Sequence, residues 1–274
     1  MNYARPFRLG LLSLALIAGP ASAALLYDND LPNDSIGMAT RPDSAGKQEI
    51  EAADDFVLTQ STRLTSATFT GLIPLGTGVS NIGTVRVEIY RVFPLDSNNP
   101  PSGAVPTRVN SPSDVAFLER ESGSDLSYTT QLGLRNQGLN SVVNNISVNA
   151  GGEGKVLGQQ IQFTTDFTAP IDLAAGHYFF VPQVELANGD FLWLSAARPP
   201  ALTPFAPDLQ AWMRNEALNP DWLRVGTDIV GGTTPPTFNG AFSLIGTPVP
   251  EPSSTLLFTS GLFVLGLWSL RKRS

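Results

Sequence analysis

Short segments in which apolar and polar residues alternate with a period of two dominate the middle of the chain. In residues 85–92 the sequence reads VRVEIYRV, so one face of an extended strand would be apolar and the other mostly polar. Similar β-rich segments occur at residues 65–72, 141–148, 160–167, 178–186, 191–196 and 238–245. This pattern predicts several strands that each bury one face.

Turn-forming residues separate these segments. Asn188-Gly189 lies between two apolar-aromatic segments, which is typical of a β-hairpin. Residues 95–114 are rich in Pro, Ser and Asn and predict a long surface loop. Many short strands and little helix predict an all-β fold, a single β-sandwich or jelly-roll domain over residues 24–247.

One stretch of the body has helical character. In residues 207–224, Leu209, Trp212 and Met213 could share an apolar face, and Pro220 would end the helix. We therefore expect a short helix that caps one end of the sandwich.

The end of the chain is different from the body. Residues 253–270 contain no charged side chain, and 18 residues form a helix of about 27 Å. This length is close to the roughly 30 Å of a membrane hydrocarbon core, so the segment predicts a transmembrane helix. A basic tail follows it, and the positive-inside bias would keep this tail in the cytoplasm: Arg271, Lys272 and Arg273.

Pro250, Glu251 and Pro252 precede the apolar segment, and the two prolines favour an extended, accessible backbone. This tripeptide, the apolar segment and the basic tail together resemble the PEP-CTERM sorting signal of Gram-negative bacterial surface proteins. The resemblance covers residues 248–274. It implies that an exosortase, a membrane enzyme, recognises Pro250, Glu251 and Pro252, removes the helix and passes the body to the cell surface. An ordinary tail anchor that is never processed is the alternative.

The first 23 residues read as a secretory signal peptide. Arg5 and Arg8 form a basic region, residues 9–19 are apolar, and Ala21 and Ala23 are the small residues that signal peptidase accepts. We expect cleavage after Ala23. The protein would then cross the inner membrane, stay anchored there through residues 253–270 until processing, and finally lie at the cell surface or outside the cell.

The charge and the cysteine content exclude several classes of function for the body. The chain has 24 acidic and 17 basic residues, and five of the basic ones lie in the two terminal segments, so the body is strongly acidic. This charge repels nucleic acid and favours divalent cations. The absence of cysteine excludes disulfides, thiolate catalysis and thiolate metal sites.

The chain lacks the residue patterns of common hydrolases. It has one histidine and neither a G-x-S-x-G nor an H-E-x-x-H motif, and we interpret His177 as the start of a strand. Glu49, Glu51, Asp54 and Asp55 could supply the paired carboxylates of a polysaccharide hydrolase. Because neighbours on a strand face opposite ways, Asp54 and Asp55 would not share one site, and surface charge or ion binding is the preferred interpretation.

A second acidic group follows the signal peptide. Asp28, Asp30 and Asp34, with the intervening Asn29 and Asn33, offer the oxygen ligands that calcium prefers. Glycine and glutamate are missing at the EF-hand positions, and Asn and Asp also favour turns. A structural calcium site or a solvated loop are the two interpretations, and no other cofactor is expected.

Trp193, Trp212 and Trp222 are candidates for stacking on a sugar ring, as is Tyr178. The alternative for each is packing in the core.

These observations predict a non-enzymatic, exported surface or matrix protein whose body has a structural, adhesive, glycan-binding or cation-binding role. Exopolysaccharide is the partner that the sorting-signal resemblance suggests. The alternatives are a polysaccharide-active hydrolase and an unprocessed tail-anchored envelope protein.

Overall fold

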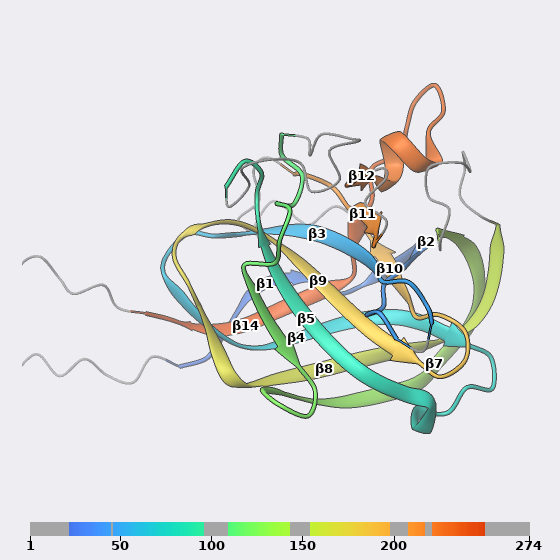
Figure 1. Ribbon diagram of the computed structural model, residues 1–274, viewed down its shortest axis with the longest axis horizontal. Helices are drawn as coiled ribbons and strands as arrows, with labels where there is room; N and C mark the ends of the chain where they lie inside the picture. Colours follow the sequence, from blue (N-terminus) through green and yellow to red (C-terminus); the bar gives the residue numbers. More distant parts are fainter. Residues whose placement is uncertain are drawn as a thin grey trace, which may run out of the picture.

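A computed structural model describes residues 22–44, 46–95, 109–142, 154–197, 208–216 and 221–249. Over these residues the chain is mostly β-strand and forms two sheets, with only two short helical turns (Figure 1). The eight-stranded sheet has the order β1-β14-β4-β8-β7-β2-β10-β13 and an additional β4–β10 pairing. The six-stranded sheet has the order β12-β11-β3-β9-β5-β6.

The elements follow one another along the chain with these bounds: β1 Ala24–Asn29, β2 Pro32–Ala39, β3 Ile50–Leu58, β4 Thr62–Pro74, 3-10 helix η1 Val79–Asn81, β5 Ile82–Arg91, β6 Leu118–Glu121, β7 Leu126–Val142, β8 Lys155–Leu173, β9 Gly176–Leu186, β10 Leu192–Ala196, β11 Trp212–Asn215, β12 Leu223–Arg224, π-helix η2 Val225–Val230, β13 Asn239–Gly240 and β14 Phe242–Pro248.

Most strands that the alternating pattern predicts are confirmed. The segments predicted at residues 65–72, 160–167 and 178–186 lie within β4, β8 and β9, and the segment at 85–92 overlaps β5. The segment at 141–148 begins in β7, and its residues 143–148 lie outside the described part of the chain. The two sheets and their β-sandwich-like arrangement agree with the predicted all-β fold.

The two sheets share one aromatic core. Phe242 of β14 stacks on Tyr27 at 4.5 Å and on Phe180 at 4.8 Å between ring centroids, and it meets Trp193 edge-on at 5.8 Å. Phe180 belongs to the six-stranded sheet and the other three rings belong to the eight-stranded sheet. Apolar burial between the sheets therefore holds the two layers together.

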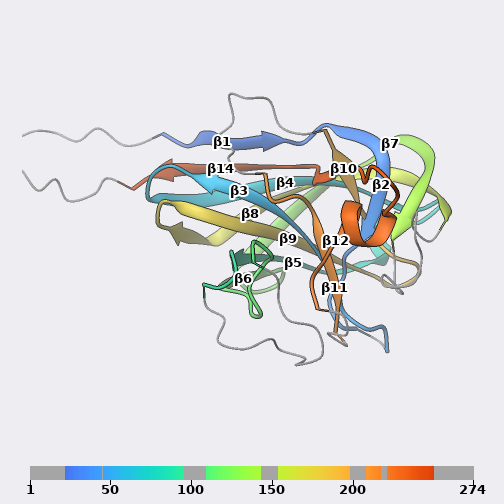
Figure 2. The same ribbon diagram turned by 90° about the horizontal axis from the view of Figure 1, so that it is seen from above.

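A second apolar cluster covers the outer face of the six-stranded sheet. Phe179 of β9 and Tyr90 of β5 point outward there and pack with Leu209, Trp212 and Trp222. β11 and β12 form one edge of this sheet (Figure 2). The described part of the loop expected at residues 95–114 forms no strand or helix, and Leu95 and Val109 are exposed. Ser111 and Ser113 are nevertheless buried, and the Ser113 carbonyl accepts from Trp222 of this cluster. Residues 96–108 lie outside the described part.

The helix expected at residues 207–224 is wrong where the chain is described. Residues Trp212–Asn215 form β11, which pairs antiparallel with β3, and the short π-helix begins only at Val225. The reason lies in the tertiary structure. The edge of β3 offers backbone hydrogen-bond partners to this segment, and β11 is buried on both faces, so its adjacent apolar residues fit a strand.

The hairpin expected at Asn188-Gly189 is also wrong. The turn joins β9 to β10, but these strands belong to different sheets, so it connects the two layers instead. Gly189 still has the positive φ of 79° that the Asn-Gly signal indicates. Local turn chemistry was therefore predicted correctly and strand pairing was not.

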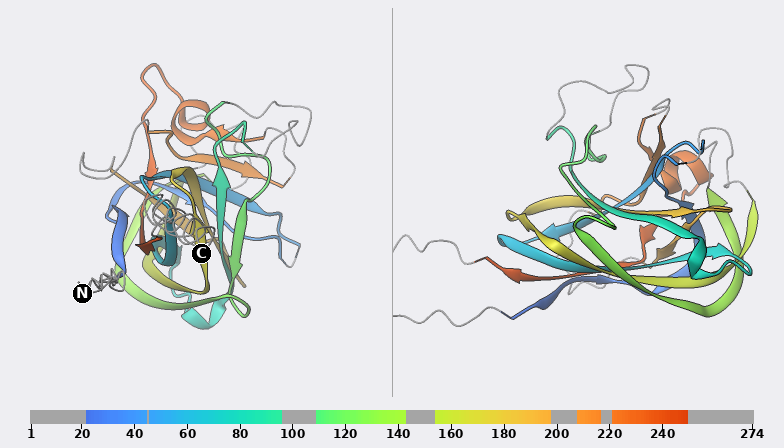
Figure 3. Two further views of the ribbon diagram at one scale, coloured as in Figure 1. Left: turned by 90° about the vertical axis from the view of Figure 1, so that its left-hand side faces the viewer. Right: turned by 60° about the horizontal axis from the view of Figure 1, so that its bottom comes forward.

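The two ends of the described body lie at the same end of the molecule. β1 pairs antiparallel with β14, with Ala24 opposite Gly246, and Thr62 at the start of β4 lies opposite Pro248 (Figures 1 and 3). We call this the proximal end. Thirteen residues at about 3.3 Å each make β4 roughly 40 Å long, and its last residue, Pro74, marks the opposite, distal end.

Candidate functional site

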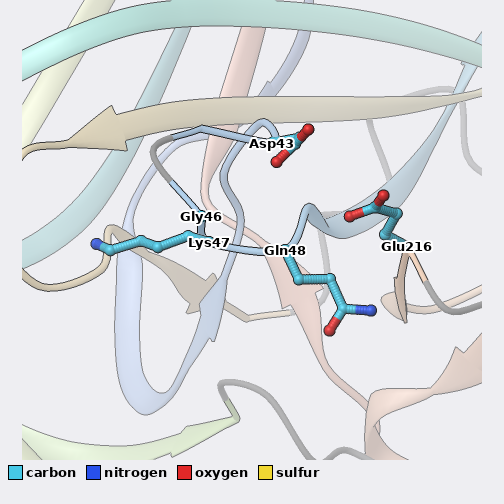
Figure 4. A pocket seen from close by; sticks show the side chains of 5 residues that line it. All are labelled: Asp43, Gly46, Lys47, Gln48 and Glu216. Carbon is cyan, nitrogen blue, oxygen red and sulfur yellow. The ribbon is translucent and has the colours of Figure 1, made fainter.

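A pocket of about 370 Å³ lies where the chain crosses from β2 to β3. Figure 4 shows the five residues that line it: Asp43, Gly46, Lys47, Gln48 and Glu216. The first four belong to the β2–β3 connection, and Glu216 directly follows β11. We call it the distal pocket.

A tight turn shapes this connection. Ser44 and Lys47 exchange backbone hydrogen bonds of 3.2 and 2.8 Å, and Gly46 between them has φ of 79°. A side chain at position 46 would be strained in this conformation. The backbone of Glu216 donates to the carbonyl of Glu49 at 3.0 Å, which holds the Glu216 wall against the connection.

Lys47 anchors the pocket to the distal end. Its Nζ donates to the carbonyl oxygen of Gly189 at 2.5 Å, and in Figure 4 its side chain points away from the carboxylates. A Cβ on Gly189 would stand 2.4 Å from the Pro74 ring, so the turn and the end of β4 are in contact. Arg41 adds an ion pair of 2.6 Å to Asp190 of the same turn.

The polar side chains of the distal pocket are mainly hydrogen-bond acceptors. Asp43 and Glu216 contribute carboxylates and Gln48 contributes an amide, and all three can accept from sugar hydroxyls or ligate a hydrated cation. None of the five described lining residues is aromatic, so a sugar would be held here by hydrogen bonds and not by ring stacking.

The carboxylates of β3 are held by different partners. Glu49, before the strand, accepts from Gln183 at 2.8 Å, and its pKa is raised by burial and by the neighbouring Glu51. Glu51 is buried on the outer face, where it contacts Tyr90 and Arg214. Glu49 and Glu51 therefore have different hydrogen-bond partners.

A third glutamate completes this outer polar network. Burial and the carboxylates of Glu51 and Glu49 raise the pKa of Glu88 to about 9. Its Oε2 lies 3.4 Å from the Tyr90 hydroxyl, which places two carboxyl groups against one phenol. At neutral pH a neutral Glu88 beside Glu51 avoids the repulsion of two buried charges.

Asp54 and Asp55 face opposite sides of β3, as predicted. Asp54 points between the sheets, where its Oδ2 accepts from the Gly240 backbone at 2.9 Å and its Oδ1 is buried without a described partner. Asp55 points outward and is also fully buried. Burial raises the pKa of both carboxyls, and the negative charge of Asp55 raises that of Asp54 further.

The partner of Asp55 is distant in the sequence. His177 does open β9, as expected, but its Nε2 lies 2.5 Å from Asp55 Oδ2 and its ring lines a separate pocket. The two residues are 122 positions apart, and no local motif links them. The lone histidine was the only available signal.

The burial of the three tryptophans contradicts the expectation that they stack on a sugar ring. Trp193 lies in the aromatic core and Trp212 and Trp222 in the outer cluster, with exposed fractions of 0, 3 and 1 %. Each indole donates its N–H to a backbone carbonyl. Tyr178 is buried at 6 %. A ring enclosed in this way has no face to offer a sugar.

The structure does not bring the three expected calcium ligands together. The pKa of Asp30 is raised by burial and by Asp28 beside it, whereas Asp34 forms an ion pair with Arg135. Across the described ranges, no group of three or more His, Asp or Glu side chains is arranged to hold a metal ion. The calcium site stays a prediction.

The predicted sorting and signal residues lie almost entirely outside the described part of the chain. Ala23 is exposed immediately before β1, and the last described backbone bond runs from Val249 to Ser61 at 2.8 Å. The remainder are undescribed: Ala21, Pro250, Glu251, Pro252, residues 253–270, Arg271, Lys272 and Arg273. Among the residues with described positions, no helix has the length and apolar character needed to cross a membrane.

The fold defines the chain as an all-β protein of two sheets with a polar pocket at its distal end. No protein-family model, curated protein or solved structure matches it.

Proposed function

We propose that this is an exported surface or matrix protein whose β-sandwich is presented by its proximal end and binds glycan or cations at its distal end without catalysing a reaction. A signal peptide at residues 1–23 and a PEP-type sorting signal at residues 248–274 deliver it. Signal peptidase and an exosortase are its processing partners.

The pairing of β1 with β14 carries this proposal. It places Ala24 opposite Gly246, so the two ends of the described body, to which the proposed signal peptide and sorting signal would be joined, lie side by side. A body joined to the membrane at this one end could keep its fold while the two terminal segments are removed. The proposed signal-peptidase cleavage after Ala23 would also spare the sheet, since β1 begins at Ala24.

The distal pocket supports the binding role by its position. Through Lys47 and Gly189 it is linked to Pro74, roughly 40 Å along β4 from the proximal end. A ligand that enters there would not meet the membrane, and the acceptors Asp43, Gln48 and Glu216 suit hydroxyl-rich polymers.

Replacing Pro250, Glu251 and Pro252 together with alanine should keep the protein in the membrane fraction of an exosortase-bearing Gram-negative host. The unaltered protein should be recovered from the surface with Ala24 at its start and without Arg271, Lys272 and Arg273, as intact-mass measurement would show. The double variant T233A/T234A, in an exposed loop, should be processed normally. Surface protein that still carried the basic tail would instead indicate an unprocessed tail anchor.

The double variant D43N/E216Q should reduce binding of the surface protein to neutral polysaccharides on a glycan array by at least about tenfold, because charged acceptors form the stronger hydrogen bonds. Asp172→Asn removes an exposed carboxylate away from the pocket and should bind as before. Equal binding by D43N/E216Q would exclude this pocket. Shortened glycans on the array would favour the hydrolase.

A further inference from the structure

We infer that four buried side chains on the outer face of the six-stranded sheet, Glu51, Glu88, Tyr90 and Arg214, form a pH-sensitive latch that holds β11 on β3. The latch is closed at acid and neutral pH, and the loss of one proton from Glu88 at alkaline pH releases β11. This inference concerns the fold and does not depend on the proposed function. Because Glu216 directly follows β11, release would also remove one wall of the distal pocket.

A single buried arginine connects β11 to the strands beyond its edge. β11 has only four residues, and its backbone pairs with β3 and with the two-residue β12. The guanidinium of Arg214 contacts the carboxylate of Glu51 on β3 and donates to the Tyr90 hydroxyl of β5 at 3.1 Å. The Tyr90 hydroxyl itself donates to Glu51. These side chains therefore join β11 to β3 and β5 through one cation.

Glu88 brings a second carboxyl group to this one cation. Only 5 % of Glu88 is exposed, and its Oε2 lies 3.4 Å from the Tyr90 hydroxyl. That hydroxyl has one proton, which it donates to Glu51, so Glu88 can bond to the phenol only by donating a proton of its own. Among the described residues, no arginine or lysine forms an ion pair with Glu88. A protonated Glu88 fits this site, whereas an ionised one would be a buried charge without a counter-charge.

The charged and titratable groups that face Glu88 are mostly acidic. They come from β5, β6, β11 and the start of β3: Glu49, Glu51, Arg86, Tyr90, Glu119, Glu121 and Arg214. On β9 the residue opposite Glu88 is the apolar Val181. Arg86 forms its ion pairs with Glu49, Glu119 and Glu121.

The proton on Glu88 sets the direction of the pH dependence. Burial, and then the charges of Glu51 and Glu49, raise the pKa of Glu88 to about 9. Burial also raises the pKa of Tyr90, so the phenol keeps its proton at that pH. A solvated glutamate has a pKa of about 4.3, so above this pH the closed latch holds a proton that the open one does not. The stability of the closed latch therefore falls as the pH rises, and this contribution is lost as the pH passes about 9.

Two buried methionines make the test direct. Met213 lies in β11, and Met38 lies in β2 of the other sheet. In the full chain held in detergent micelles with ¹³C-labelled methionine methyl groups, the Met213 signal should move to the position of an exposed methionine as the pH rises through about 9. The Met38 signal should stay in place. Glu88→Gln keeps a neutral side chain at every pH and should abolish the movement of Met213.

Two controls accompany this variant. At neutral pH both methionine signals of Glu88→Gln should coincide with those of the unaltered protein, which shows that the variant folds. Glu119→Gln removes the cross-strand neighbour of Glu88, whose side chain is 48 % exposed, and should keep the transition. A Met213 signal that stayed in place well above that pH, a Met38 signal that moved with it, or an unchanged transition in Glu88→Gln would each overturn the latch.

Discussion

Replacing Arg214 with alanine should lower the free energy of unfolding by about 3–5 kcal/mol, because it leaves Glu51 buried without its counter-charge. Arg214 is buried, contacts Glu51, donates to the Tyr90 hydroxyl at 3.1 Å and lies over Trp222 at 4.4 Å. It thereby joins β11 to β3 and β5. Urea denaturation followed by tryptophan fluorescence would measure the loss.

Two further variants separate charge from packing. The double change E51Q/R214M should recover part of the stability, since it removes the buried charge of Glu51, whereas Asp221 still loses its ion pair of 3.6 Å with Arg214. Arg63→Ala, in an ion pair whose two side chains are more than half exposed, should leave the urea midpoint nearly unchanged. If R214A and R63A behaved alike, the outer polar network would contribute nothing to holding β11 on the sheet.

Phe242→Ala should destabilise the protein by about 3–5 kcal/mol, which is the usual cost of removing a buried phenyl ring. Phe242 is fully buried and touches aromatic rings of both sheets, so the cavity would open between the layers. Phe242→Leu should cost less because it fills part of that space. The midpoint of urea unfolding provides the measurement.

Leu157→Ala is the matched control for this prediction. Leu157 is 62 % exposed, and its truncation should change the free energy of unfolding by less than about 0.5 kcal/mol. A loss for Phe242→Ala below about 1 kcal/mol would mean that the two sheets are not held by this shared core.

Local pattern was sufficient for the strands but not for their partners. The alternation in residues 85–92 reports which face of β5 is buried, because side chains of a strand alternate whatever it pairs with. Residues 126–140 of β7 were missed, since many of them are polar and exposed or only partly buried. The segment at 212–215 looked helical because Leu209, Trp212 and Met213 could share one face of a helix, and only its pairing with β3 made it a strand.

The candidate sites depended even more on tertiary contacts. Asp54 and Asp55 were expected on opposite faces, and they are, because that follows from strand geometry alone. Glu51 and Arg214 are 163 positions apart, and Lys47 and Gly189 are 142 apart. Strand register brings such pairs together, and register is a property of the whole sheet.

By itself the sequence determined the all-β class, the alternation of buried faces, the acidic cysteine-free composition and the resemblance of its terminal segments to export and sorting signals. Each of these is encoded within about 25 neighbouring residues or in the composition. The tertiary structure alone decided that the tryptophans are buried, that Asp55 holds His177, and that the two ends of the described body lie side by side. These features require contacts between distant residues, which are selected by the burial of apolar surface between the two sheets and on the outer face of the six-stranded sheet.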